Sequence, residues 1–355
     1  MPLLHLPNEI LLAIGDFLSF SSLARLLRTC QHLHTLLTPP LYRSILRHDS
    51  GASAVRFACL NNAPTVANVF LSRYHTNPNI TFADDSLYLN DLAHSPLHLC
   101  AHLGSQDVIN QLLDHNADIN IRNTAQATPL HAAAATNKIS TTQLLLVRGA
   151  DPMARDDLEQ MPLHLAAKKG HAGVVALLLR CPGVGVDDAC KDPQNEVDGG
   201  YTALHGAADF GHVEVARELL RCGAKVDAKI EQSEWTPLGC AAAEGYEEVV
   251  RLLLEAGAEV NVTPEVPLRL AVDGKWCDGV LRLLLERGAD VDSAIHGLYH
   301  AETANRLVEF ANSLLKTPAP PGTQFRGVVE GEHGEAVGLR ESQTALVPME
   351  GVAAS

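Results

Sequence analysis

The sequence has few aromatic and few basic residues for its length. Phe, Trp and Tyr make up 5% of the 355 residues, and 27 Lys and Arg stand against 42 Asp and Glu, giving a formal net charge of −15. Binding to nucleic acid depends largely on Lys and Arg that neutralise phosphates. This charge balance therefore argues against a nucleic-acid partner.

Motifs of enzymes, disulfide scaffolds and membrane spans are also missing. The chain has no G-x-S-x-G and no G-x-x-x-x-G-K, and residues 183–185 lack the third glycine of a dinucleotide loop. Its eight cysteines form no C-x-x-C pair, which is typical of a reducing compartment. The apolar start is interrupted by Glu9 and Asp16 and has no basic region, unlike a signal peptide. We expect a cytoplasmic or nuclear protein that is not an enzyme and binds no cofactor, no metal and no membrane.

What the sequence does contain is a phrase of the form T-P-L-H-x-A-A that returns along the chain. Its copies begin at Ser95, Thr128, Met161, Thr202, Thr236 and Val266. The residues at the second position of the phrase are spaced by 33, 33, 41, 34 and 30 positions. Such a period indicates stacked structural units, because one unit alone cannot bury its apolar face.

Each unit carries the signals of two helices. Thr before Pro starts the first helix, because the Thr oxygen caps free amides and Pro lacks only an amide that has no partner there. Glycines are predicted to end this helix with positive φ, at Gly104, Gly170, Gly211 and Gly245. A second helix follows, with leucines at i, i+3 and i+4 spacing.

The phrase and its period resemble the ankyrin repeat. The resemblance implies an all-α ankyrin-repeat solenoid of helix-turn-helix units with β-turn fingers. It also implies that the His of the phrase hydrogen-bonds within and between repeats; the four histidines are His98, His131, His164 and His205. We predict a degenerate repeat over 51–94, repeats over 95–297, a capping helix over 298–316 and a disordered tail over 317–355.

Residues 1–46 follow a different pattern, with helical apolar spacing that predicts three short amphipathic helices. The phrases LPNEIL, FLSFSSLARLLRTC and LLTPPLYR resemble an F-box, the helical motif that docks on the Skp adaptor of cullin-RING ubiquitin ligases. An F-box followed by ankyrin repeats is similar to F-box/ankyrin proteins of fungi. The resemblance implies adaptor contacts from Leu6, Pro7, Ile10, Leu11, Ile14, Phe17 and Leu18. The alternative is that these helices only cap the first repeat.

A partner of the repeats would meet the residues that vary between repeats. Ankyrin stacks bind with the inner faces of their first helices and with their fingers, so we expect target contacts there. The predicted target-binding residues are Leu103, Lys168, Lys169, Phe210, Trp235 and Glu244. Leu103 and Phe210 are apolar where solvent is expected, and Trp235 is a finger aromatic of the kind that anchors interfaces. Packing of Phe210 and Trp235 against adjacent repeats is the alternative.

One segment, residues 181–200, exceeds the repeat period by about eight residues and is rich in Gly, Pro and acidic residues. It is either a partner-specific projection or a tolerated insertion. The combined pattern predicts a non-catalytic substrate-recognition subunit of a Skp-cullin-F-box ubiquitin ligase, monomeric outside that complex. Its partners would be the Skp adaptor, the cullin-RING ligase and an unidentified protein target. An ankyrin scaffold with no link to a ligase is the competing hypothesis.

Overall fold

The computed structural model of the chain describes residues 52–82, 95–191, 199–262, 266–296, 298, 301–314, 329–330 and 336–337. It divides into two units, Met1–Gln232 and Ser233–Ser355. The predicted F-box-like module and its seven predicted adaptor contacts lie outside the described residues. Within the predicted tail, the description is limited to strand β3 (Val329–Glu330), which pairs antiparallel with β4 (Ala336–Val337).

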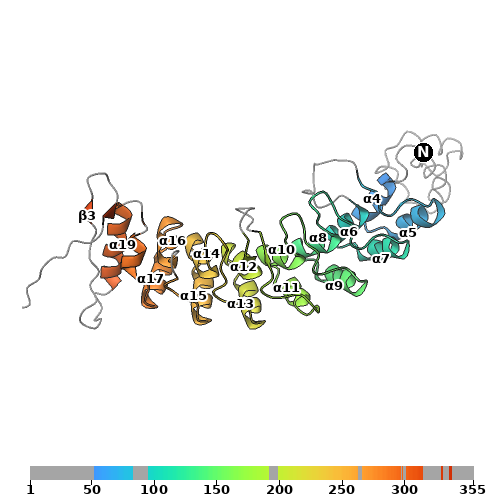
Figure 1. Cartoon of the computed structure of the whole chain (residues 1–355). Helices are drawn as coiled ribbons and strands as arrows, with labels where there is room; N and C mark the ends of the chain where they lie inside the picture. The colour runs from blue at the N-terminus through green and yellow to red at the C-terminus, as the bar shows by residue number, and fades with distance from the viewer. Residues whose placement is uncertain are drawn as a thin grey trace, which may run out of the picture. The chain divides into compact units, whose positions relative to one another are not determined.

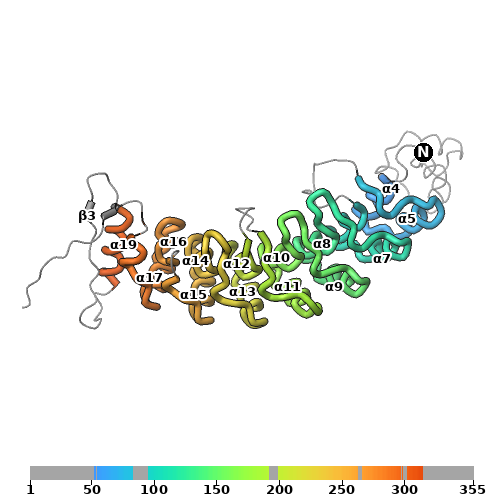
Figure 2. The backbone as a smooth tube through the Cα atoms, in the orientation of Figure 1, coloured from blue at the N-terminus to red at the C-terminus, as the bar shows by residue number. Residues whose placement is uncertain are grey.

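The first unit is a stack of helix pairs (Figure 1). It begins with α4 (Ala52–Leu60), α5 (Pro64–Asn68) and the π-helix η2 (Val69–Arg73). Four pairs follow, whose first helices are α6 (Pro96–Leu103), α8 (Pro129–Ala135), α10 (Pro162–Lys168) and α12 (Ala203–Asp209). Their second helices are α7 (Gln106–Asp114), α9 (Ile139–Val147), α11 (Ala172–Leu178) and α13 (Val213–Arg221). The first helices pack on one another in sequence order and form one layer, which the second helices back (Figure 2).

The second unit continues the same pattern. Its pairs are α14 (Pro237–Glu244) with α15 (Glu247–Glu255) and α16 (Pro267–Asp273) with α17 (Asp278–Glu286). Two further helices, α18 (Val291–His296) and α19 (Ala301–Leu314), pack against each other and close this unit. The prediction of an all-α repeat solenoid is confirmed. In the described parts of the chain, every helix is too short or too polar to cross a membrane.

The first helices begin where the repeated phrase predicts. Thr128 has extended backbone angles, and Pro129 is the first residue of α8. In the second unit the Thr236 hydroxyl accepts a hydrogen bond from the Gly239 amide at 3.2 Å. These caps occupy amides that have no partner inside the helix. The glycines predicted to end first helices have φ angles of 87°, 78°, 73° and 76°, in chain order Gly104, Gly170, Gly211 and Gly245.

Apolar packing between neighbouring pairs forms the core. One leucine of each second helix in the first unit is fully buried: Leu112, Leu145, Leu178 and Leu219. The alanine pairs of the first helices, such as Ala166 and Ala167, are also fully buried. Burial of a leucine side chain contributes roughly 1.5–3 kcal/mol, and small residues let neighbouring helices approach closely.

The repeated histidines link consecutive repeats inside this core. His131 Nε2 lies 3.0 Å from the Gln160 carbonyl of the next repeat, while its Nδ1 accepts a hydrogen bond from the Thr128 amide at 3.1 Å. His164 does the same with the Met161 amide at 3.1 Å and the Asp188 carbonyl at 2.8 Å. Because Nδ1 accepts and Nε2 donates, both rings are neutral. Burial, the largest cause, lowers the pKa of each of these two histidines to about 4.

Residues 181–200, which exceed the repeat period, include one strand of a short antiparallel pair. Strand β1 (Ala189–Cys190) pairs antiparallel with β2 (Tyr201–Thr202), with Cys190 opposite Tyr201. The Tyr201 hydroxyl donates to the Asp209 carboxylate at 3.1 Å, and its ring stacks on His205. The pairing therefore holds the middle of residues 181–200 beside the two residues that precede α12.

Candidate protein-interaction surface

The turns between first and second helices of the first unit carry four of the six predicted target-binding residues. We define the turn surface as residues 102–105, 135–138, 168–171 and 209–212. Leu103 ends α6 and is 36% exposed, and Phe210 follows α12 and is 42% exposed. Lys168 ends α10 and is half-buried, whereas Lys169 is exposed. Leu103 is separated from Lys168 by the helix pair α8 and α9.

Two of the predicted residues come together across neighbouring repeats. The Lys168 ammonium lies over the Phe210 ring, 5.4 Å from its centroid. The His212 ring stacks on Phe210 at 6.4 Å with an interplanar angle of 15°. An ammonium over an aromatic face is attracted by the ring quadrupole, by about 0.5–1 kcal/mol at an exposed site. Phe210 is therefore held in place and still presents apolar surface to solvent.

Side chains from each turn bond to the end of the preceding first helix. The Thr136 hydroxyl donates to the His102 carbonyl at 3.2 Å. His171 Nε2 lies 3.1 Å from the Ala135 carbonyl, and His212 Nε2 lies 3.0 Å from the Lys168 carbonyl. These bonds satisfy carbonyls that have no partner within their own helix. They also fix consecutive turns to one another, so that the turn surface is continuous along the first unit.

His212 has little freedom to move because it packs on Gly170. A Cβ at Gly170 would lie 2.7 Å from His212 Nδ1, and Gly170 has a φ of 78°. Glycine is needed at this position both for the positive φ and for the close approach of the ring. His171 and His212 were not predicted as parts of this surface, although both follow a turn glycine in the repeated pair Gly-His.

Lysines provide the positive charge of the turn surface. Lys138, Lys168 and Lys169 are the first three of the eight lysines in the chain. Burial and the nearby Lys138 lower the pKa of His102. Burial is also the largest cause that lowers the pKa of His171. Both histidines are consequently neutral at pH 7.

Acidic groups near the turn surface are engaged. Asp209 is buried and accepts a hydrogen bond from the Tyr201 hydroxyl at 3.1 Å. Glu214, in the first turn of α13, pairs with Arg217 at 3.7 Å. The turn surface therefore presents local positive charge in a chain whose formal net charge is −15.

The other two predicted residues belong to the second unit. Trp235 is half-buried and precedes the N-cap residue Thr236. The Glu244 carboxylate lies 2.6 Å from the Lys275 ammonium and raises the pKa of that lysine. Since Glu244 already pairs with a neighbouring turn, a partner would have to compete with Lys275 for it.

A cluster of side chains around Trp276 in the second unit was not predicted from the sequence. The Arg306 guanidinium lies 4.0 Å from the centroid of the Trp276 ring, and Phe310 meets that ring edge-on at 6.2 Å. The Trp276 indole also donates to the Asp278 carboxylate at 2.8 Å. Position in the repeat could have placed Trp276 in a turn, but α19 follows no repeat phrase, and no sequence signal links it to this turn.

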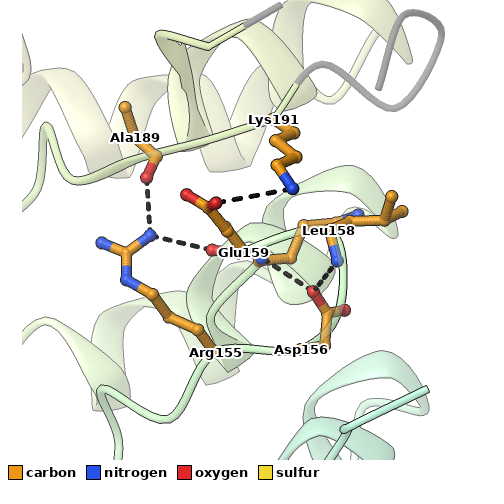
Figure 3. A network of polar contacts seen from close by, with 7 residues as sticks. Arg155, Asp156, Leu158, Glu159, Ala189 and Lys191 are labelled. Carbon is orange, nitrogen blue, oxygen red and sulfur yellow. Dashed lines mark hydrogen bonds and ion pairs between the residues drawn. The ribbon is translucent and has the colours of Figure 1, made fainter. Parts of the chain in front are cut away.

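The fingers of the first unit are joined by arginines (Figure 3). The Arg155 guanidinium donates to the Glu159 carbonyl of its own finger at 2.8 Å and to the Ala189 carbonyl of the next at 2.7 Å. Arg122 repeats this arrangement one unit earlier, with the carbonyls of Gln126 and Arg155. Each arginine therefore fixes the spacing of two successive fingers.

Asp156 shapes the same finger. One oxygen of its carboxylate accepts from the Leu158 amide at 3.0 Å and from the Gln160 amide at 2.8 Å. Burial raises the pKa of Asp156 to about 6.

The described residues include no cluster of three His, Cys, Asp or Glu that could hold a metal ion. The arrangement is one of hydrogen-bonded fingers and turns with exposed side chains.

Comparison with known proteins identifies both modules of the chain. A model of the family "Ankyrin repeats (3 copies)" matches residues 55–156, 130–230, 163–264 and 229–295. A model described as "F-box-like" matches residues 3–48. A comparison with curated proteins found no match. The chain belongs to the ankyrin-repeat family and carries an F-box-like domain ahead of its repeats.

Proposed function

We propose that this chain is a substrate-recognition subunit of a Skp-cullin-F-box ubiquitin ligase. The F-box-like domain binds the Skp adaptor, and the repeats bind a protein that is to be ubiquitylated. The chain performs no chemistry of its own in this role. It contributes by proximity, since holding the target and the conjugating enzyme on one frame raises their effective concentration.

The observation that carries this proposal is the order of the two modules. An F-box-like match over residues 3–48 is followed directly by repeat matches from residue 55 onward. An isolated helical module of this size buries little surface by itself, which favours a partner for it. The proposed adaptor contacts are Leu6, Pro7, Ile10, Leu11, Ile14, Phe17 and Leu18.

On the target side, we propose that the partner contacts the turns of the first unit and, in the second, Trp235 and Glu244. Leu103 and Phe210 supply exposed apolar surface, and Lys168 and Lys169 supply charge. Aromatic side chains such as Phe are enriched at protein interfaces, where a few buried anchors dominate the binding energy.

Co-migration with the Skp adaptor on a sizing column tests the ligase role. The full chain is expected to elute as a complex with the adaptor, and the variant Leu6→Ala/Pro7→Ala/Ile10→Ala is expected to elute apart from it. Val147→Ala, at a residue 78% exposed on α9, is the matched control and should co-elute like the parent chain. Circular dichroism checks that all three proteins are folded.

The competing function is an ankyrin scaffold whose N-terminal helices only cap the first repeat. In that case the parent chain elutes without the adaptor although it is folded. The triple variant would then lower the thermal stability of the repeats, because it would damage their cap.

A further inference from the structure

We propose that the target segment recognised by the first unit is an acidic peptide with an apolar side chain, which lies along the turn surface. This inference rests on the proposed function, since it specifies the chemistry of the target. Lys138, Lys168 and Lys169 pair with its carboxylates, and Phe210 packs against its apolar side chain.

Charge complementarity is the first argument. Three of the eight lysines in the chain lie in two neighbouring turns, Lys138 in one and Lys168 and Lys169 in the other. The nearby carboxylates of Asp209 and Glu214 are bonded to Tyr201 and Arg217. At physiological ionic strength, charges interact over about 8 Å, so a bound peptide senses these lysines more than the net charge of the whole chain.

The presentation of Phe210 is the second argument. Phe210 is 42% exposed although its ring contacts both the Lys168 ammonium and the His212 imidazole. His212 in turn bonds to the Lys168 carbonyl at 3.0 Å. A partner that binds a side chain already held in place loses less conformational entropy. Phe210 is thus prepared as an apolar anchor directly beside a cation.

The overall charge of the chain separates a peptide from a nucleic acid. A nucleic acid spans many charges and would approach a protein of formal net charge −15 against repulsion. A short acidic peptide covers only a few turns. The side-chain and backbone bonds between Thr136 and His102, His171 and Ala135, and His212 and Lys168 make these turns a continuous track for an extended chain.

Selection from a random 12-residue peptide library, displayed on phage and using the full chain as bait, tests the proposal. The parent chain is expected to enrich peptides with several Asp or Glu beside a Phe, Leu or other large apolar residue. The variant Lys168→Glu/Lys169→Glu/Phe210→Ala is expected to lose this enrichment. One enriched peptide is then synthesised, and its Kd should be at least tenfold higher for the variant than for the parent chain. The Kd for the parent chain should also rise with the salt concentration.

The matched control is Lys225→Glu/Lys229→Glu/Val147→Ala, which makes the same change of charge and truncates one apolar side chain, all at exposed residues outside the turn surface. It should select the same acidic peptides as the parent chain. Enrichment of basic or neutral peptides by the parent chain, or equal acidic enrichment by the turn variant, overturns the proposal. So does binding of a labelled 20-nucleotide RNA that depends on the same three residues while no acidic peptide is enriched.

Adaptor binding separates this inference from the proposed function. The turn variant should still co-elute with the Skp adaptor, and the F-box variant Leu6→Ala/Pro7→Ala/Ile10→Ala should still select acidic peptides. Failure of the peptide selection alone refutes the acidic target, and failure of co-elution alone refutes the ligase role.

Discussion

The two units share one repeat pattern but differ in the bonds that link their repeats. In the first unit His98, His131 and His164 bridge from a helix start to the finger of the next repeat. In the second unit the corresponding positions hold Gly239 and Arg269, and α14 still packs on α16. Apolar packing and capping are therefore sufficient for the fold. The histidine bridges add hydrogen bonds between consecutive repeats of the first unit. We expect them to make this unit more sensitive to acid.

The turns of the two units differ in charge as well. The first unit places Lys138, Lys168 and Lys169 there, whereas in the second unit Glu244 ends α14 and Glu247 and Glu248 begin α15. Glu247 pairs with Arg251 at 2.7 Å on α15. The same fold thus supports two surfaces of different electrostatic character, and a partner can distinguish between them.

Acidification should affect the first unit most. His131 and His164 have a pKa of about 4 when folded, below the ordinary 6.5 of the unfolded chain. The unfolded state therefore binds more protons between these values, and the stability present above pH 6.5 is lost as the pH falls toward 4. The loss is about 2 kcal/mol for each histidine by pH 5.

Protonation of Asp156 changes the stability of the first unit in the opposite direction. Its folded pKa of about 6 lies above the ordinary value of 3.8, so acidification through this range favours the folded state and offsets part of the loss. Urea unfolding at pH 7 and pH 5, followed by circular dichroism, should show a lower midpoint at pH 5. An equal or higher midpoint at pH 5 would contradict neutral, buried histidines.

Removing one histidine bridge should have the next largest effect on stability. His131→Ala leaves the Thr128 amide and the Gln160 carbonyl without this partner and opens a cavity at a fully buried site. We expect a loss of about 3 kcal/mol in the free energy of unfolding. Amide hydrogen exchange should accelerate in α8 and α10 and stay unchanged in α15. His296→Ala, at an exposed residue of the second unit, is the control and should change little.

Removing an arginine that joins two fingers should lower the free energy of unfolding by less. Arg155→Ala removes hydrogen bonds to the Glu159 and Ala189 carbonyls, and we expect a loss of about 1–2 kcal/mol. Both bonds come from one guanidinium nitrogen, Nη1, which stands one bond further along the side chain than a lysine ammonium. Arg155→Lys should therefore not restore this loss in full. The control is Arg217→Ala, whose residue makes an exposed ion pair with Glu214. Full rescue by Lys would argue that charge alone matters at this position.

Replacing one glycine inside a helix by alanine should have the smallest effect on the free energy of unfolding. This change should raise the stability, whereas the changes above lower it. Gly206 lies inside α12, where a Cβ would meet Tyr201 and the Lys168 backbone at 3.6 Å, an ordinary contact distance. Gly206→Ala should therefore stabilise the first unit by about 0.5–1 kcal/mol, since glycine is costly inside a helix. Gly170→Ala should destabilise it because of the positive φ and the close His212 ring. A thermal melt of both variants measures the two signs together.

The sequence predicts the repeat framework well because its signals are local. Thr128 before Pro129 marks a helix start, and glycines such as Gly104 mark helix ends without knowledge of distant contacts. The pairing of β1 with β2 was not predicted, because it depends on register across residues 191–200. The stacking of Arg306 on Trp276 was also not predicted, because α19 lies outside the repeat period.

Prediction of the candidate surface was partial for the same reason. Exposure of Leu103 and Phe210 follows from their place after the small residues of each first helix. The contact between Lys168 and Phe210 joins two repeats whose phrases are 41 positions apart, and the sequence alone does not show their alignment. The F-box contacts lie outside the described residues and stay predictions.

Amide hydrogen exchange of the full chain with and without the Skp adaptor tests the central claim most directly. The account predicts slower exchange in peptides from residues 3–48 on addition of the adaptor, with no change across the turn surface at residues 102–212. Unchanged exchange at residues 3–48 under saturating adaptor, or protection confined to the repeats, would contradict it.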